Sequence, residues 1–299
     1  MKLRVCVTGA AGFIGSNLSR SLEERGDEVI KCDPRDQQMI DSDSLISTIE
    51  KGKIDAVIHL GAISSTTEDN IESLCVNNIL LSCKILERCL ENQIPFSYAS
   101  SASVYGDGSL GFSEDQVMTP LNYYAISKAS FDSFVLKKIE DNPRAKIFGM
   151  RYFNVYGSNE DHKKDMASPV YKFFIQSIKE RKIRIFEGSE KFKRDFIHVK
   201  DASRITIDSL SFHRSGIYNV GTGIPESFKD VACKVSNITG SEIIEIPFPD
   251  HLKKKYQMYT CSNNAKISRE IPQDRISMSD GIGMVAKDLI DGKLTTEIY

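Results

Sequence analysis

The chain has 299 residues, long enough to bury a large hydrophobic core, and we expect one compact unit with two lobes. A formal net charge of −2 and a pI near 6.3 give no electrostatic basis for binding nucleic acid or a membrane surface. The first residues run directly into a strand-like segment without a signal peptide, and no apolar run approaches the length of a membrane span, so we expect a cytoplasmic protein.

The first predicted element is a short apolar strand over residues 3–7, and a glycine-rich turn follows it. Gly9, Gly12 and Gly15 are spaced Gly-x-x-Gly-x-x-Gly, and a helix is expected over Asn17 to Arg25. Glycines in such a turn let a pyrophosphate approach the backbone, and the start of the helix offers unpaired amides to the phosphates. A glycine-rich turn is often only a turn, but its place between a strand and a helix predicts dinucleotide binding.

The second predicted strand, residues 28–33, ends on an acid that lies about 20 residues beyond the glycine turn. This acid is Asp33, and an acid at this place is expected to bind the adenosine ribose of a dinucleotide. Arg35 lies two residues later and could meet a 2′-phosphate. The residues alone therefore leave both NAD and NADP open.

Apolar strand-like runs then alternate with amphipathic helical stretches. Strands are expected at residues 55–60, 95–100 and 145–153, with helices at 70–91 and 123–141. This alternation predicts an α/β protein with a doubly wound parallel Rossmann sheet. Beyond residue 155 the pattern loosens into a smaller C-terminal α/β substrate-binding lobe, with helices expected at 168–181, 201–212 and 227–238 and strands at 183–186 and 243–246.

These elements divide the chain into a dinucleotide-binding domain over residues 1–155 and a second lobe over 156–299. Part of 192–222 is expected to return to the first domain. The second lobe should pack against the carboxyl edge of the sheet, where ligands of such folds bind.

The cysteines and histidines point to no disulfide and no metal. Seven cysteines are scattered without a Cys-x-x-Cys pair, and Cys6, Cys32 and Cys75 are expected to be reduced residues of the core. No cluster of histidine, cysteine and carboxylate residues has the spacing of metal ligands, so we expect no structural or catalytic metal.

Tyr124 and Lys128 stand four residues apart in the helix predicted for 123–141, so both side chains share one face. A free tyrosine has a pKa near ~10, and a neighbouring cation lowers that pKa. The pair is therefore suited to proton transfer in alcohol chemistry. Tyrosine and lysine are common on helix surfaces, but the glycine-rich turn in the same chain favours the functional interpretation.

The glycine turn, Ser101 in the segment 99–106, and the Tyr124–Lys128 pair together resemble the extended short-chain dehydrogenase/reductase family, which includes the NAD-dependent epimerases and dehydratases. The resemblance implies that Ser101 and Tyr124 hydrogen-bond the reacting oxygen and that Lys128 holds the nicotinamide ribose. The alternative for Ser101 is an ordinary hydrogen bond at a strand end, because Ser100 and Ser103 crowd the same turn.

Further segments resemble one branch of that family, the epimerases that invert C6 of an ADP-linked heptose. They cover nearly the whole chain: 61–68, 151–157, 162–168, 186–196 and 248–256. This resemblance implies conversion of ADP-D-glycero-D-manno-heptose to the L-glycero form by transient oxidation and reduction with tightly bound NADP, NAD being the alternative. It also implies a homo-oligomer.

The same resemblance implies the site residues. At the cofactor it places Phe13, Ile14, Asp33, Gly61, Ala62, Ile63, Ser64, Asn77, Lys128 and Val155. At the nucleotide-sugar it places Asn154, Phe186, Glu187, Gly188, Ser189, Arg194 and Tyr256.

Arg194, Tyr256 and Lys163 each have a specific expected role and a specific alternative. Arg194 could fork onto a diphosphate, or pair with Asp195 or Glu190. Tyr256 could stack on or hydrogen-bond the substrate, or be a surface residue. By analogy to the heptose enzymes, Tyr124 serves one face of the inverted carbon and Lys163 the other, although a lysine in so charged a loop is usually solvated.

Three other functions remain open at this stage. One is another nucleotide-sugar epimerase, for instance acting at C4. A 4,6-dehydratase needs a carboxylic acid beside the active serine, whereas Ala102 and Ser103 follow Ser101 here. A non-catalytic NADP-sensing protein would not need serine, tyrosine and lysine at all three positions.

The chain also departs from the heptose branch. The segment between Asp33 and Asp55 is shorter, which bears on the choice between NADP and NAD. Asp165, Lys172 and the pair Ser158-Asn159 differ from the expected residues near the sugar and bear on its identity.

Overall fold

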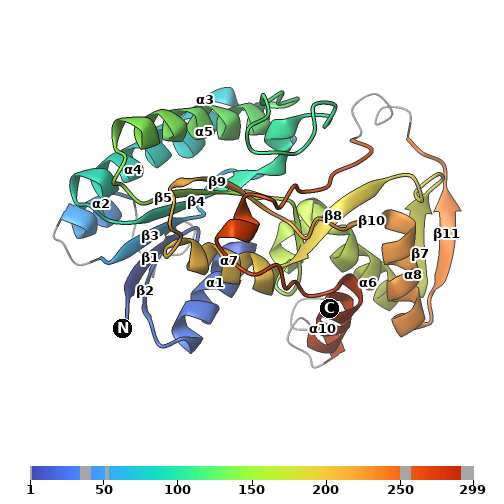
Figure 1. Ribbon diagram of the computed structural model, residues 1–299. Helices are drawn as coiled ribbons and strands as arrows, with labels where there is room; N and C mark the ends of the chain where they lie inside the picture. The colour runs from blue at the N-terminus through green and yellow to red at the C-terminus, as the bar shows by residue number, and fades with distance from the viewer. Residues whose placement is uncertain (1, 34–41, 51–53, 250–256, 291–299) are drawn as a thin grey trace.

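The computed structural model describes residues 2–33, 42–50, 54–249 and 257–290, and its elements form a Rossmann-like α/β fold (Figure 1). Six parallel strands make the central sheet in the order β2-β1-β3-β4-β5-β9. Their bounds are β1 Arg4–Thr8, β2 Glu28–Cys32, β3 Ala56–His59, β4 Phe96–Ser101, β5 Ile147–Tyr152 and β9 Gly216–Val220. The predicted doubly wound parallel sheet is confirmed.

Helices cover both faces of this sheet. On one face lie α1 (Phe13–Glu24) and α7 (Val199–Ser209); on the other lie α2 (Ser42–Glu50), α4 (Leu81–Glu91) and α5 (Tyr123–Asp141) (Figure 1). The inner strands are buried on both faces, as β3 is buried at every residue, because side chains on both sides of a covered parallel strand point into a core. Apolar clusters accordingly fill both layers between sheet and helices.

The strand order reverses at β1, which pairs with β2 on one side and with β3 on the other. Ligands of open parallel sheets bind beyond the carboxyl ends of the strands at such a switch point. The ends that meet here are Thr8 of β1 and His59 of β3, which are partners in the register. The glycine turn follows Thr8 directly, so the topology places it where a dinucleotide is expected.

Two smaller sheets form the second lobe. One has the order β10-β8-β6, with β6 Asn154–Tyr156, β8 Lys193–His198 and β10 Pro225–Ser227. The other pairs β7 (Lys182–Phe186) with β11 (Glu242–Ile246) in parallel. The helices of this lobe are α6 Pro169–Glu180, α8 Phe228–Thr239 and α10 Met278–Ile290.

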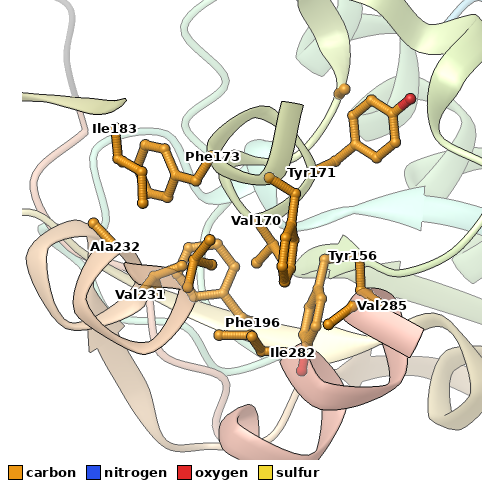
Figure 2. Close-up of a cluster of buried hydrophobic side chains, with 14 of the residues drawn as sticks. Tyr156, Val170, Tyr171, Phe173, Ile183, Phe196, Val231, Ala232, Ile282 and Val285 are labelled. Atoms are coloured by element: carbon orange, nitrogen blue, oxygen red, sulfur yellow. The ribbon is translucent and has the colours of Figure 1, made fainter. Parts of the chain in front are cut away.

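These elements share one apolar core, drawn in Figure 2. Val170 of α6, Val231 of α8 and Ile282 of α10 converge there with Tyr156 of β6 and Phe196 of β8 (Figure 2). Burying side chains of this size stabilises a fold by about 1.5–3 kcal/mol each. The second lobe therefore has a hydrophobic core of its own.

The chain crosses between the two parts more than once. It leaves the central sheet after β5, enters the second lobe at β6, and returns when α7 packs on α1 and β9 adds to the sheet beside β5. The lobe boundary at residue 155 stays a prediction.

Several elements differ from the sequence expectations. Helix α1 begins at Phe13 rather than Asn17, directly after its N-cap residue Gly12. Strand β8 and helix α10 were not expected, and β8 in particular contains charged residues that are nevertheless buried. The expectation that Cys75 belongs to the core is wrong: it is exposed, because the adjacent Leu74 takes the buried position, whereas Cys6 and Cys32 are buried.

Candidate active site

Ser101, Tyr124 and Lys128 come together at the carboxyl end of β4. Ser101 is the last residue of that strand, and Tyr124 is the second residue of α5, whose N-cap Asn122 accepts a hydrogen bond from the amide of Ala125 at 2.8 Å. Tyr124 and Lys128 are only 9% and 7% exposed, and Tyr124 hydrogen-bonds Ser101. The structure thus assembles the three residues that the sequence pattern singled out.

The pKa of the Tyr124 phenol differs from the expectation. Burial raises it, a hydrogen bond with Ser101 opposes the rise, and the Asp132 carboxylate adds to it. The expected lowering by Lys128 is not observed, and burial is the largest cause of the shift. The Lys128 ammonium donates to the carbonyl oxygen of Ala99 at 2.8 Å. Burial lowers the pKa of Lys128 to about 8, against the opposing attraction of Asp132. Lys128 can therefore exchange a proton close to neutral pH.

Ser101 also serves the local turn. Its Oγ accepts hydrogen bonds from the amide of Ser103 at 3.2 Å and from the Ser103 hydroxyl at 2.9 Å. It caps the short helix Ala102–Tyr105 in this way. Ser101 therefore both caps the turn at the end of β4 and contacts Tyr124.

The glycine turn forms a cradle that only glycine can line. A Cβ on Gly9, whose φ is +67°, would lie 2.6 Å from the amide nitrogen of Gly61. A Cβ on Gly15 would lie 2.1 Å from the carbonyl oxygen of Gly9. Helix α1 begins at Phe13, and its N-cap residue Gly12 has no side chain to cap it, which leaves the first amides of the helix facing this turn. This arrangement fits the pyrophosphate of a dinucleotide.

Asp33 supports the same turn. It follows β2, is 1% exposed, and accepts a hydrogen bond from the amide of Ala11 at 3.2 Å. Its predicted contact with the adenosine ribose stays a prediction. Arg35, predicted to meet a 2′-phosphate, lies outside the described residues.

The segment 61–64 is held by residues on both sides. The amide of Gly61 donates to Thr8 Oγ1 at 3.0 Å. Asn78 clamps Ile63, because its Oδ1 accepts from the Ile63 amide at 2.8 Å and its Nδ2 donates to the Ile63 carbonyl at 3.0 Å. Ala62 is partly buried and Ser64 is exposed. The segment is therefore fixed to the ends of both flanking elements.

The neighbouring Asn77 has a different partner. Its amide donates to the carbonyl of Ser73 at 2.9 Å, one turn back along the chain. Both asparagines lie in the π-helical stretch Cys75–Leu80. Sequence reasoning named Asn77 and missed Asn78, because two adjacent asparagines carry no signal of which one faces the segment 61–64.

His59 at the end of β3 is a second residue that sequence reasoning missed. Its Nδ1 lies 2.6 Å from Thr8 Oγ1, and its Nε2 lies 2.9 Å from Ser82 Oγ. Ser82 already donates its hydroxyl proton to Asn78 O at 2.8 Å, so Nε2 carries the ring proton and Nδ1 accepts from Thr8. A neutral His59 therefore joins β1, β3 and the helix above them.

The buried, neutral His59 predicts that the folded protein loses stability at acidic pH. Burial lowers the pKa of His59 from 6.5 to about 3. Between these two pH values, His59 is protonated in the unfolded chain and neutral in the folded protein. The stabilisation is present above pH 6.5 and is lost as the pH falls towards 3. At about pH 4.5 the loss should reach about 3 kcal/mol in the free energy of unfolding.

Urea unfolding at about pH 7 and about pH 4.5 checks this prediction. His59→Asn should remove about half of the pH-dependent loss, because burial also lowers the pKa of His198 to about 4. His213→Asn, at a side chain 87% exposed, should keep the whole loss. Equal pH dependence in wild type and His59→Asn would contradict the assignment.

Lys163 lies beside the start of α1. Its Nζ is 4.6 Å from the ring centroid of Phe13 and 3.2 Å from Oε2 of Glu160. Glu160 is fully buried, whereas the Lys163 side chain is 24% exposed. Lys163 is thus neither free in solvent nor remote from the glycine turn, and its role as a second acid/base group stays a prediction.

The remaining predicted cofactor residues lie close by. Phe13 is 6% exposed, and Ile14 and Val155 pack on one apolar cluster beneath the carboxyl edge of the sheet.

Most residues predicted for the substrate gather in the second lobe. Phe186 ends β7, and its ring lies 5.1 Å from that of Phe248. The turn after it contains Glu187, Gly188 at φ +76°, and Ser189, whose buried Oγ has no hydrogen-bond partner in the described part of the chain. A turn with a polar atom still to be satisfied is consistent with a ligand site.

Arg194 connects the second lobe, through Gln257, to the turn that follows Ser101. It is 7% exposed, donates to the carbonyl oxygens of Lys193 and Gln257, and its guanidinium lies 5.6 Å from the ring centroid of Phe228. Gln257 in turn donates to Gly106 O at 2.6 Å, just beyond the Ser101 turn.

The other two predicted substrate residues are less informative. Asn154 begins β6 and pairs with Phe196 in the register of β8. Tyr256 lies outside the described residues.

No group of three or more histidine, cysteine, aspartate or glutamate residues that could hold a metal occurs within the described ranges. Likewise, no described helix is long and apolar enough to cross a membrane.

A glycine turn at the switch point of a parallel sheet, with a serine, a tyrosine and a lysine at the end of a nearby strand, defines a nicotinamide-dependent short-chain dehydrogenase/reductase fold. The model of the NAD dependent epimerase/dehydratase family matches residues 5–221. The chain belongs to this family.

One curated relative is similar over most of the chain. The ADP-L-glycero-D-manno-heptose-6-epimerase of Brachyspira hyodysenteriae is 39% identical over 288 residues, which cover 88% of this chain and 90% of that protein.

Solved structures share the fold at lower identity. The Helicobacter pylori ADP-L-glycero-D-manno-heptose-6-epimerase superposes with a TM-score of 0.85 at 24% identity, covering 97% of this chain and 96% of that one. The UDP-N-acetylglucosamine 4-epimerase of Methanobrevibacter ruminantium has a TM-score of 0.83 at 24% identity, covering 97% and 99%. At these identities the structures show the fold alone.

Proposed function

We propose that this protein interconverts the C6 epimers of ADP-glycero-manno-heptose, taking the D-glycero form to the L-glycero form. The observation that carries the proposal is the Ser101–Tyr124–Lys128 group, in which Tyr124 and Lys128 are buried, beside the glycine turn. The 39% identity to a relative named for this activity, over most of both chains, supports the choice of sugar.

The chemistry follows from the carbon that is inverted. A carbon that bears a hydroxyl and has no adjacent carbonyl has no acidic C–H proton. Abstraction of that proton therefore cannot invert the carbon. A bound nicotinamide supplies the removal of a hydride and its return to the opposite face. The protein must therefore hold the sugar by its nucleotide, let the oxidised carbon turn, and move a proton on each face.

Residues of this chain are assigned to these tasks. Tyr124 exchanges the proton of the reacting oxygen on one face while Ser101 hydrogen-bonds that oxygen, and Lys128 holds the nicotinamide ribose. Lys163 serves the second face, supported by its position beside Phe13. Arg194 holds the diphosphate, and the turn from Phe186 to Ser189 borders the nucleotide.

The proposed cofactor is tightly bound NADP, with NAD as the alternative. Asp33 beside the glycine turn suits a free ribose hydroxyl, whereas Arg35 two residues later suits a 2′-phosphate. Mass spectrometry of the nucleotide released by denaturing the purified protein distinguishes the two. We further expect a cytoplasmic homo-oligomer, which light scattering of the purified protein would test.

Proton NMR of the protein mixed with each pure ADP-heptose epimer tests the proposed function. Either epimer should give the same equilibrium mixture. UDP-glucose and UDP-N-acetylglucosamine serve as controls in parallel tubes. Conversion of one of these at C4, with ADP-heptose unchanged, would replace the proposal by a C4 epimerase, and no conversion of any sugar with cofactor bound would favour a cofactor-sensing protein.

Lys163→Ala should lower epimerisation by about 100-fold or more, because one face of the carbon loses its proton-transfer group. Cofactor content should remain near that of wild type. His162→Ala, at the exposed neighbouring position, is the matched control and should keep normal activity. Near-normal epimerisation by Lys163→Ala would remove this lysine from the reaction.

A further inference from the structure

Asp132 is a fully buried carboxylate of α5, one helical turn beyond Lys128. It accepts hydrogen bonds from Tyr98 Oη at 2.8 Å, Ser100 Oγ at 2.9 Å and Arg151 Nε at 2.9 Å. Arg151 is 1% exposed, so both members of this ion pair are withdrawn from water. Removing one partner of a buried ion pair is costly, because it leaves the other charge buried without compensation.

The bonds of Asp132 interlock α5 with β4. Tyr98 and Ser100 of the strand donate to Asp132, while Ala99 between them accepts from Lys128. The next strand residue, Ser101, contacts Tyr124. Four successive residues of β4 thus bind a row of three side chains spaced one turn apart on α5. The bonds to Asp132 fix the rotation of the helix about its axis, and with it the direction of Lys128 and Tyr124.

The row consists of the neutral phenol of Tyr124, the ammonium of Lys128 and the carboxylate of Asp132. The other titratable groups that face this row are His59 from β3, Tyr98 from β4 and Arg151 from β5. Asp132 raises the pKa of Lys128 against the effect of burial, and it also raises the pKa of Tyr124.

His59 is neutral above about pH 3 and therefore adds no charge near neutral pH. Arg151 lies beyond Asp132 and is bonded to it, and the shift of the Lys128 pKa comes from burial and Asp132. Asp132 is therefore the anion that balances the buried ammonium.

We propose that Asp132 is a positioning residue of the epimerisation, anchored by Arg151, which holds Tyr124 towards the reacting oxygen and Lys128 towards the nicotinamide ribose. Asp132 is assigned no contact with substrate or cofactor and acts through Lys128 and Tyr124, one and two turns before it on the helix. The inference rests on the proposed function, because it assumes that Tyr124 and Lys128 carry out the reaction.

The pH dependence of kcat tests the proposal in a matched pair of variants. Asp132→Asn keeps the shape of the side chain and removes its charge, so the alkaline limb of the pH–rate profile, where Lys128 and Tyr124 lose their protons, should move to lower pH by about one unit. Tyr98→Phe removes one hydrogen bond to Asp132 and keeps the charge, so both limbs should stay in place. A purely structural role would lower the activity of Asp132→Asn without moving the alkaline limb, and that result overturns the proposal.

A second variant covers the case in which Asp132→Asn unfolds because Arg151 keeps its charge. In Asp132→Asn/Arg151→Gln both charges are gone, and the alkaline limb should again move to lower pH. If neither variant folds, the pair is structural and the proposal is wrong. Tyr124→Phe separates the two proposals. If it keeps full activity, the proposed function of Tyr124 fails; if it is inactive while the alkaline limb of Asp132→Asn stays in place, only the positioning role fails.

Discussion

Tyr124→Phe should reduce kcat for epimerisation by about 10²–10⁴-fold, the range that general acid–base groups contribute. The side chain is 9% exposed and its hydroxyl hydrogen-bonds Ser101, so the substitution removes the phenol group that faces Ser101. Because burial keeps its pKa above the usual value for tyrosine, the phenol is neutral at rest and can donate its proton. Cofactor affinity should change little, since the aromatic ring remains.

Tyr123→Phe is the matched control, because Tyr123 precedes Tyr124 on α5 and is 46% exposed. It should keep wild-type kinetics. The measurements are initial rates by NMR or coupled assay and cofactor content by absorbance. Loss of both activity and cofactor in Tyr124→Phe would instead indicate a structural role for the hydroxyl.

Gly15→Ala should reduce cofactor affinity by about 100-fold or more. The new Cβ would lie 2.1 Å from the carbonyl oxygen of Gly9, a backbone atom that can move only with the turn. Displacing the cradle by about 1 Å carries a penalty on the order of 10²-fold at a site that depends on close positioning. Activity should fall with cofactor occupancy and should recover in part when excess cofactor is added.

Gly283→Ala provides the control for this substitution, since a Cβ there meets nothing within 4 Å. It should leave cofactor affinity unchanged and stabilise α10 by about 1 kcal/mol, because alanine favours a helix interior over glycine. Isothermal titration with NADP and NAD on cofactor-stripped protein measures both variants. Unchanged affinity in Gly15→Ala would mean that the cofactor does not approach the turn.

Residues whose role follows from local spacing could be predicted from the sequence. Gly9 and Gly15 were assigned from the strand and helix around them, and their would-be Cβ atoms meet backbone in the structure. The helix Tyr123–Asp141 agrees with its predicted bounds, so the shared face of Tyr124 and Lys128 follows from helical geometry alone.

Buried polar residues could not be predicted in this way. His59 and Asp132 have partners 51 and 34 residues away, in Thr8 and Tyr98, and nothing local distinguishes a buried aspartate from one on a surface helix. Strand β8 was missed for the same reason, because its arginine and aspartate suggest exposure. Asp195 is nevertheless fully buried, with both of its carboxylate oxygens accepting hydrogen bonds from Thr222, Gly223 and Ser262.

Epimerisation in deuterium oxide tests the account most directly. If the hydrogen at C6 leaves as a hydride and returns to the same carbon, pure ADP-D-glycero-D-manno-heptose should convert to the L-glycero epimer with protium retained at C6. Deuterium at C6 of the product would show that a solvent proton, and not a returned hydride, completes the inversion, and would contradict the account.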